Sequence, residues 1–266
     1  MRVVGMIPAR YSSVRLPGKA LADIAGKPMV VQVYERARAA ACLDEVLVAT
    51  DDERIKAAVE AAGGRAEMTR SNHPSGTDRL AEVAGRVECD LVVNIQGDEP
   101  LIEPQVVEQV VAPLLADQSI GMGTVAAEIT DPQEYLNPSV TKVVVDREGF
   151  ALYFSKGPIP FYRVDGEAPP AGVPAWQHLG APPPLKHLGL YVYRRETLLW
   201  LSGLEPTPLE QAEKLEQLRA LERGCRIKVA LTEYSPVSVD TPEDLQRVRA
   251  LVAFRLARPS PGGQRG

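Results

Sequence analysis

The first ~115 residues alternate short apolar runs with amphipathic helical patterns, which is typical of βαβ units around a mainly parallel sheet. The apolar runs predict buried strands at 3–7, 46–49 and 91–95. Apolar residues with a helical period predict helices at 28–41, 52–62 and 103–116. The alternation therefore predicts an α/β fold whose central, mostly parallel sheet is flanked by helices.

The middle of the chain has a different character. Further strands are predicted at 121–128, 142–145, 188–193 and 226–231. The segment from Asp165 to Pro184 is rich in proline, glycine and alanine. We interpret this segment as a surface excursion and not as a linker between domains, because the strand after it still needs a sheet to join.

Two late helices have clear start signals. Thr207, Pro208 and Glu210 form a capping box, and the apolar residues that follow, up to Leu218, predict one continuous helix. The same start signal recurs at Thr241. The sequence at 255–266 is rich in arginine, proline and glycine, and we expect a frayed tail there.

Composition narrows the functional classes. The net charge of −5 is the wrong sign for a general electrostatic surface for nucleic acid. The three cysteines are far apart and odd in number, which favours free thiols in a reducing compartment. No apolar run approaches the ~20 residues that span a bilayer, and the first residues lack a signal peptide pattern. We therefore expect a cytoplasmic protein that binds neither nucleic acid nor membrane.

A basic loop follows the first predicted strand. It carries Arg10, Arg15 and Lys19 together with Gly18, and it leaves the sheet where open α/β folds bind ligands. A turn at Gly18 could direct backbone N–H groups to a phosphate, and the three cations would supply positive charge. The spacing matches neither the P-loop nor the Rossmann fingerprint. A solvated basic loop is the alternative interpretation.

Two acidic residues are candidates for a metal site. Asp98 follows the predicted strand 91–95 within Gln96-Gly97-Asp98, and Asp240 precedes Thr241. Mg²⁺ prefers carboxylate oxygens and usually keeps only one or two protein carboxylates beside substrate oxygens. The alternatives are a plain turn at Asp98 and a helix start at Asp240.

Two further polar segments have both a functional and a structural interpretation. Residues 69–79 lead into a helix at about Thr77, whose N-terminus could hold a base or ribose or could be an ordinary capped loop. Lys186 and His187 begin a predicted strand. They could receive a substrate carboxylate as a cationic pair, or His187 could simply be packed.

Eight short motifs occur in order along nearly the whole chain: IPARYSSVRLPGKAL, VATDD, SGTDRLAEV, VVNIQGDEPLI, ALYFSK, KHLGLYVYR, PLEQAEKLEQLRAL and VDTPEDLQRV. Together they resemble the 3-deoxy-manno-octulosonate (Kdo) cytidylyltransferases, or CMP-Kdo synthetases. The resemblance implies a nucleotide-diphosphosugar transferase fold, with one domain over 1–254. About 121–206 would contribute a small lobe that binds the sugar and forms a homodimer.

The resemblance also implies an activity and its residues. The activity is Mg²⁺-dependent transfer of CMP from CTP to the anomeric hydroxyl of Kdo, for lipopolysaccharide-type surface polysaccharide. The implied catalytic residues are Lys19, Asp98 and Asp240, of which the two aspartates would hold Mg²⁺. The implied nucleotide-binding residues are Arg10, Arg15, Lys19, Ser75, Gly76, Thr77, Arg79 and Gln96. The implied sugar-binding residues are Lys156, Lys186, His187, Tyr191, Glu213 and Gln217.

The sequence departs from the family pattern in two places. Lys156 stands where the family commonly has arginine, and lysine lacks the planar fork that grips a carboxylate. The proline-rich segment 165–184 also differs. These departures keep open another sugar acid as acceptor, such as an amino analogue of Kdo or a sialic acid. A catalytically silent nucleotide-binding regulator is a separate alternative, which the presence of Lys19, Asp98 and Asp240 disfavours.

Overall fold

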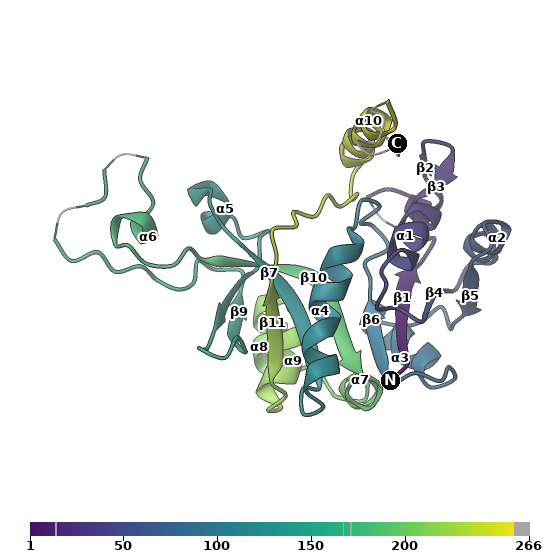
Figure 1. Cartoon of the computed structure of the whole chain (residues 1–266), viewed down its shortest axis with the longest axis horizontal. Helices are drawn as coiled ribbons and strands as arrows, with labels where there is room; N and C mark the ends of the chain where they lie inside the picture. Colours follow the sequence, from purple (N-terminus) through teal and green to yellow (C-terminus); the bar gives the residue numbers. More distant parts are fainter. Residues whose placement is uncertain (14, 167, 171, 258–266) are drawn as a thin grey trace, which may run out of the picture.

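In a computed structural model of the 266-residue chain, the structure describes residues 1–13, 15–166, 168–170 and 172–257. A nine-stranded mixed sheet forms the centre and carries helices on both faces (Figure 1). The main path of the sheet is, in spatial order, β11 (Ile227–Leu231), β7 (Met122–Glu128), β10 (Leu185–Arg194), β6 (Leu91–Asn94), β1 (Val3–Ala9), β4 (Glu45–Thr50) and β5 (Arg65–Met68). Along this path β10 is antiparallel to both of its neighbours, and the other pairs are parallel. The predicted mixed, mostly parallel sheet is therefore confirmed.

The smaller strands lie outside the main path. β8 (Lys142–Val145) pairs with the start of β10 and with β9 (Ala151–Ser155). β2 (Asp23–Ile24) and β3 (Lys27–Pro28) form a separate hairpin. The helices are η1 (Lys19–Leu21), α1 (Met29–Arg38), α2 (Glu53–Ala61), α3 (Gly76–Ala84), α4 (Pro104–Ala116), α5 (Pro132–Leu136), α6 (Ala175–His178), α7 (Arg195–Ser202), α8 (Pro208–Glu213), α9 (Gln217–Glu222) and α10 (Pro242–Ala257).

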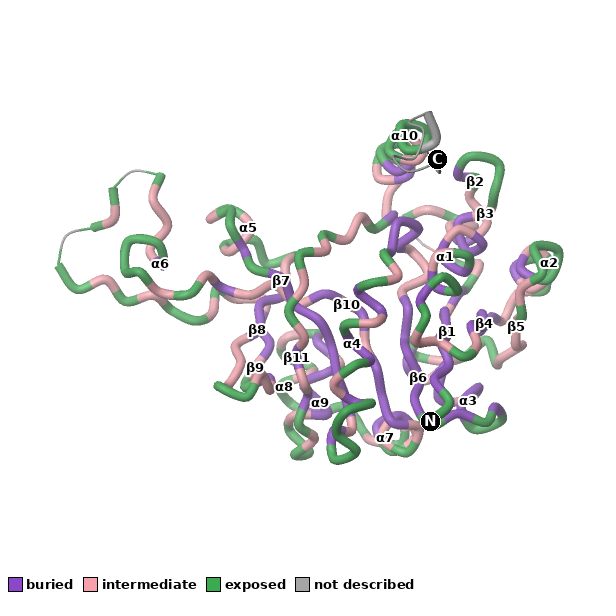
Figure 2. Tube along the Cα trace, in the orientation of Figure 1, coloured by how far each residue is buried: buried purple, intermediate pink, exposed green. Residues whose placement is uncertain are grey.

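The sheet buries both of its faces, because successive side chains of a strand point to opposite sides. In β1, Val3 and Ile7 join one core cluster with apolar side chains of α1, α2 and α4. Val4 and Met6 join a second cluster with α3, α7 and α9 on the other face. The central strands are accordingly buried along their length (Figure 2). This two-sided burial explains why the strands read as continuous apolar runs in the sequence.

The helix predicted to run from Thr207 through Leu218 is wrong as a single element. The capping box of Thr207 and Glu210 is present, but the chain breaks at Lys214, whose φ is +56°. α8 has no buried residue, so no apolar face requires it to continue in line with α9. Instead, the Glu210 carboxylate accepts a 2.8 Å hydrogen bond from Arg219 Nε of α9, which holds the two short helices together.

The described residues of the proline-rich segment 165–184 lie on an arm that extends far from the sheet (Figure 1). The sequence did not predict α6 within it. Trp176 of α6 is 7% exposed and packs against Tyr135 and Tyr162, with ring centroids 5.4 and 5.6 Å away. At the other end of the chain, α10 continues to Ala257, so the predicted tail begins as helix, and residues 258–266 lie outside the described residues. Within the described ranges, no helix combines the length and apolar character that crossing a membrane requires.

Candidate active site

The chain order around β1 creates a crevice at the carboxyl edge of the sheet. From β1 the chain passes through α1 to β4 on one side, and it later returns to β6 on the other side of β1. Ligands bind at such switch points in open α/β sheets. A cavity of about 450 Å³ lies there, lined by Pro8, Ala9, Arg10, Ser13, Arg15, Lys19, Ala20, Met29, Gln96, Gly97, Asp98 and Asp240. The basic loop and both candidate aspartates therefore share one cavity.

Gly18 sets the direction of Lys19. Its φ is +69°, in the left-handed region that glycine adopts without steric cost, and its N–H donates to Tyr11 O. A Cβ at this position would also lie 3.2 Å from the Tyr11 ring. The turn places Lys19 at the start of η1 with its side chain only 18% exposed. The turn predicted at Gly18 is therefore present, and it points a nearly buried cation into the cavity.

Lys19 joins the two aspartates. Its Nζ lies 2.8 Å from Asp98 Oδ2 and 3.1 Å from Asp240 Oδ1. Arg15 Nη2 lies 3.0 Å from the same Asp240 oxygen. The structure thus brings together one residue from the loop after β1, one from the loop after β6 and one that precedes the last helix.

The backbone fixes the approach of the two acidic segments. The Val239 N–H donates a 2.9 Å hydrogen bond to Asp98 O, and the Val239 side chain is fully buried with Ile24, Met29 and Leu101. On the Asp98 side, a Cβ at Gly97 would come within 2.8 Å of Pro8 O, so glycine is what lets this loop pass close to the end of β1.

The side chain of Asp240 is not used to start α10. The Asp244 carboxylate accepts from the N–H groups of Asp240 and Thr241, and the Thr241 hydroxyl accepts from Asp244 N, which caps the helix. The Asp240 carboxylate instead faces Lys19 and Arg15. Asp244 and Thr241 therefore perform the helix-starting role that the sequence left as an alternative for Asp240.

The two carboxylates fit a hard cation such as Mg²⁺. An ammonium group already lies between them, within hydrogen-bond distance of one oxygen of each. Across the described residues, no group of three or more His, Cys, Asp or Glu side chains could hold a metal ion. A Mg²⁺ at Asp98 and Asp240 would therefore complete its coordination with substrate oxygens and water, as Mg²⁺ usually does.

A buried carboxyl group lies next to Asp98. Glu99 is 8% exposed and accepts a 3.4 Å hydrogen bond from Tyr234 Oη. Burial, with a further contribution from the charge of Asp98, raises the pKa of Glu99 to about 7. A partly protonated Glu99 limits the negative charge that accumulates beside Asp98.

The predicted cytidine segment is partly structural. Ser75 caps α3 by accepting from Asp78 N at 3.1 Å. Arg79 is 4% exposed and bonds to Asp51 and to the Thr69 hydroxyl, so it ties α3 to the chain after β4 and β5. A Cβ at Gly76 would lie 3.3 Å from Pro8, which puts the start of α3 beside the cavity. The contacts of Ser75, Gly76, Thr77 and Arg79 with a nucleotide stay predictions.

Gln96 connects this cavity to a second one. Its Nε2 donates a 2.7 Å hydrogen bond to Gly189 O, at an irregularity in β10 where the register with β7 shifts. The second cavity, also about 450 Å³, is lined by Glu134, Ser139, Val140, Thr141, Lys186, His187, Leu188, Gly189, Leu215, Gln217, Ser235, Pro236 and Ser238. Gln217 is 6% exposed, and its Nε2 has no hydrogen-bond partner among the described residues. An unpaired buried amide is costly, which favours a polar ligand in this cavity.

The cationic pair predicted at Lys186 and His187 does not form. Lys186 is paired with Glu134 at 2.8 Å. Burial, and secondly the charge of Lys156, lowers the pKa of His187 to about 3, so the imidazole is neutral. The Phe154 and Tyr191 rings pack against it at 5.0 and 5.2 Å. Its packing resolves the alternatives left open by the sequence: His187 is a packed, uncharged residue that still lines the cavity.

Other predicted sugar residues support the cavity wall. Glu213 accepts from Ser155 Oγ at 2.7 Å and from Lys156 N at 2.8 Å, so its carboxylate holds the end of β9. Lys142 was not predicted. It is fully buried, and its Nζ donates to the carbonyls of Asn137, Val140 and Lys156. A lysine that begins an otherwise apolar strand was the only signal for it in the sequence.

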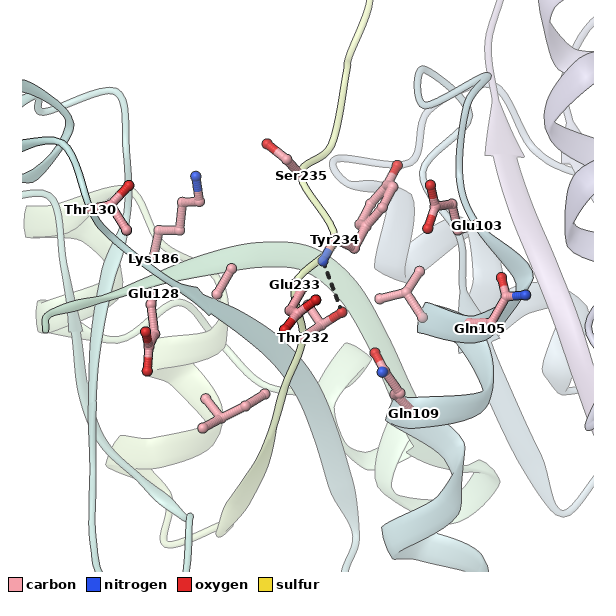
Figure 3. A pocket seen from close by; sticks show the side chains of 13 residues that line it. Glu103, Gln105, Gln109, Glu128, Thr130, Lys186, Thr232, Glu233, Tyr234 and Ser235 are labelled. Carbon is pink, nitrogen blue, oxygen red and sulfur yellow. Dashed lines mark hydrogen bonds between the residues drawn. The ribbon is translucent and has the colours of Figure 1, made fainter. Parts of the chain in front are cut away.

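A larger cavity of about 1020 Å³ lies next to the second one, and Lys186 lines both. Figure 3 shows side chains from α4, from the end of β7 and from residues 232–235 around it. Its charged lining consists of Glu103, Glu128, Glu233 and Lys186, and Lys186 already has a partner in Glu134. This acidic lining would repel a triphosphate, so the smaller, basic cavity at the switch point is the candidate nucleotide site.

Known proteins resemble this chain over nearly its whole length. The family model for cytidylyltransferases matches residues 4–227. A 3-deoxy-manno-octulosonate cytidylyltransferase of Geobacter metallireducens is 53% identical over 255 residues, covering 93% of this chain and 96% of the relative. Its counterpart in Geotalea uraniireducens is 54% identical over 248 residues, covering 93% and 98%. A solved CMP:2-keto-3-deoxy-manno-octonic acid synthetase complexed with CTP superposes with a TM-score of 0.86 at 45% identity, covering 96% of this chain and all of that chain. The predicted nucleotidyltransferase fold is thereby confirmed.

Proposed function

This chain belongs to the cytidylyltransferase family, and from that premise we propose that it transfers CMP from CTP to the anomeric hydroxyl of 3-deoxy-manno-octulosonate, with release of pyrophosphate. One observation carries the proposal: Lys19, Asp98 and Asp240 converge in a cavity that also holds Arg10 and Arg15. Relatives that are more than half identical to this chain are Kdo cytidylyltransferases, and one solved relative binds CTP.

The reaction needs positioning and charge neutralisation more than covalent catalysis. The anomeric oxygen forms a bond to the α-phosphorus of CTP while the bond to the pyrophosphate oxygen breaks in line, and the hydroxyl proton passes to solvent water. Arg10, Arg15 and Lys19 would offset the charge that builds on the leaving pyrophosphate. No covalent enzyme intermediate is needed.

Asp98 and Asp240 would hold Mg²⁺ in this scheme. When bound, the ion would neutralise triphosphate charge and lower the pKa of the attacking hydroxyl. Lys19 then has two tasks. In the free enzyme it offsets part of the charge of the two carboxylates, and in the complex its ammonium would be available to the phosphate oxygens.

The sugar acid would occupy the second cavity, beside Lys186, His187 and Gln217. Its carboxylate needs a cation, and Lys156 is the candidate because Glu213 and Lys142 both fix its backbone. Gln96 lines the first cavity and bonds to the wall of the second, so it would couple the two substrates. Pathways to lipopolysaccharide-type polysaccharide would consume the CMP-sugar.

The two rival functions have weaker support. The relatives at 53% and 54% identity are Kdo enzymes and not enzymes for a sialic acid or an amino analogue of Kdo. A silent regulator would have no need for paired carboxylates beside a lysine in the cavity.

Pyrophosphate release from CTP, measured with Kdo, an amino analogue of Kdo and a sialic acid, tests the proposal. We expect Kdo to give the highest kcat/KM. A higher kcat/KM with another acid would change the acceptor, and CTP binding without release for every acid would support the silent regulator.

We also propose that the protein is a cytoplasmic homodimer. The family resemblance implies a dimer, and a partner subunit would cover apolar side chains such as Phe161 and Leu152, which the lobe exposes by 83% and 62%. Cys42, Cys89 and Cys225 are free thiols, which suits a reducing compartment. Light scattering should give twice the mass of the 28.9 kDa chain, and a monomer mass would contradict the dimer.

A further inference from the structure

Thr124 of β7 is a fully buried hydroxyl next to the irregular part of β10. The register between the two strands shifts between Leu188 and Tyr191, so the carbonyls in this stretch lose regular ladder partners. Side chains replace the missing ladder partners. Gln96 Nε2 donates to Gly189 O, and the Thr124 hydroxyl lies 2.8 Å from Leu190 O and 3.3 Å from Leu188 O.

The Thr124 hydroxyl has a third neighbour, His187 Nε2, at 2.9 Å. A hydroxyl has one proton to donate and can accept further bonds. A carbonyl can only accept, so the 2.8 Å contact with Leu190 O requires the Thr124 proton. The contact with His187 then has the opposite sense: Nε2–H donates and the threonine oxygen accepts. His187 is therefore assigned the tautomer that carries its proton on Nε2.

The surroundings keep His187 uncharged. Phe154 and Tyr191 pack against the ring, and burial lowers its pKa to about 3. A neutral imidazole that carries its proton on Nε2 has a lone pair on Nδ1. Within the described part of the chain, Nδ1 has no hydrogen-bond partner, although the residue lines the second cavity. This nitrogen can accept a hydrogen bond from a ligand but cannot pair with a carboxylate.

We propose that Thr124 is a positioning residue that holds His187 as the Nε2–H tautomer, so that Nδ1 accepts a hydrogen bond from a hydroxyl of the sugar acid. This inference rests on the proposed function for the identity of the ligand. In this arrangement His187 binds a hydroxyl of the sugar acid, and a cationic side chain binds its carboxylate. An acceptor that lacks this hydroxyl leaves Nδ1 without its hydrogen bond from the ligand, which disfavours binding of that acceptor.

Nitrogen NMR of histidine-labelled protein without substrate tests the tautomer directly. The chain has only three histidines, so loss of one signal set in His187→Gln assigns the ring. We expect a protonated-type shift on Nε2 and an unprotonated-type shift on Nδ1 at neutral pH. Thr124→Val should shift His187 toward the Nδ1–H form, and Thr124→Ser should restore the Nε2–H form because it keeps the hydroxyl.

Thr50→Val is the matched control, since it removes another fully buried threonine hydroxyl on a strand of the same sheet, at the end of β4. It should leave the His187 signals unchanged. If Thr124→Val unfolds the protein, the wild-type spectrum still tests the tautomer on its own. A proton on Nδ1 in the wild-type protein, or wild-type His187 signals in folded Thr124→Val, would overturn the inference.

Kinetics test the role of the tautomer in binding. Thr124→Val should raise KM for the sugar acid roughly 10-fold, the value of one hydrogen bond, with KM for CTP unchanged. Among Kdo analogues that each lack one hydroxyl, one should bind wild-type enzyme as weakly as Kdo binds Thr124→Val. The KM for this analogue should not rise further in Thr124→Val. Equal losses with every analogue would contradict a specific hydroxyl contact.

The two readouts separate this inference from the proposed function. An enzyme that releases pyrophosphate with Kdo but carries the proton on Nδ1 refutes the inference alone. An enzyme with the Nε2–H tautomer that is inactive with every sugar acid refutes the proposed function, and with it the ligand that we assign to His187.

Discussion

The backbone N–H of Val239 donates a 2.9 Å hydrogen bond to the carbonyl oxygen of Asp98, joining two segments that are far apart in the chain. Because Asp240 follows Val239, this contact sets its carboxylate beside that of Asp98, and Lys19 Nζ lies within 3.1 Å of both. The free protein thus keeps two like charges together by placing Lys19 between them, with Arg15 also paired to Asp240.

Lys19→Ala should separate the structural and catalytic tasks of this cation. Without the ammonium the two carboxylates repel each other, so the unfolding free energy should fall by about 1 kcal/mol in the absence of metal. Added Mg²⁺ should restore much of this loss, and thermal unfolding with and without the ion measures it. Turnover should still fall at least ~100-fold with Mg²⁺ present. A variant that keeps near-normal turnover would reduce Lys19 to a structural counter-ion.

Glu82→Gln should weaken the loop before α3. Burial alone would raise the pKa of Glu82, but hydrogen bonds from His73 and Arg70 outweigh it and bring the pKa down to about 2. Since the folded-state pKa lies below the ordinary value of 4.5, ionised Glu82 stabilises the fold above that value, and the contribution is lost as the pH falls toward 2.

Urea unfolding at several pH values measures this effect. We expect Glu82→Gln to cost about 1 kcal/mol at neutral pH and the gap to wild type to close at low pH. Glu60→Gln, on the exposed side of α2, is the control and should show no gap. A gap for Glu82→Gln that is independent of pH would contradict the assigned role.

Trp176→Ala should loosen the arm without unfolding the core. The aromatic cluster of Tyr135, Tyr162 and Trp176 holds α6, and Trp176 is a member of none of the three core clusters among the described residues. Locally stabilised segments open independently of the global transition. We expect faster proteolysis within 157–184 at an unchanged midpoint of global unfolding. Trp200→Ala on α7 is the control, and equal cleavage in both variants would contradict the model.

Lys156→Ala should raise KM for the sugar acid roughly 10-fold and leave KM for CTP unchanged, because we propose that Lys156 pairs with the sugar carboxylate and not with CTP. Lys156→Arg should keep low KM values, since Glu213 and Lys142 hold the backbone whatever the side chain. Lys56→Ala on α2 is the control. Equal rises in both KM values would indicate a structural role for Lys156.

The sequence predicted best the parts that depend on local pattern. The buried strands β1, β4, β6 and β7 and the helices α1, α2 and α4 are found within about three residues of their predicted limits, because two-sided burial and helical periodicity leave a local signature. The cations, the turn at Gly18 and the two aspartates could be proposed from their places beside these elements.

The remainder depends on contacts that no local pattern carries. The break at Lys214 follows from how α8 packs on α9, and α8 itself offers no buried residue to reveal it. The neutral state of His187 depends on its burial, to which Phe154 and Tyr191 contribute by packing on the ring, and secondly on the charge of Lys156. Likewise, the structural bonds of Arg79 to Asp51 and to the Thr69 hydroxyl could be seen only in three dimensions, and its contact with a nucleotide stays a prediction.

Turnover of Asp98→Ala, Asp240→Ala and the double variant tests most directly whether the two carboxylates act on one triphosphate. With CTP, Mg²⁺ and Kdo, each single variant should lose at least ~100-fold in kcat/KM while staying folded, and the double variant should lose little more than the worse single variant. Asp165→Ala, on the exposed arm, is the control for a lost charge. Normal turnover in either single variant, or losses that simply multiply in the double variant, would contradict a shared site.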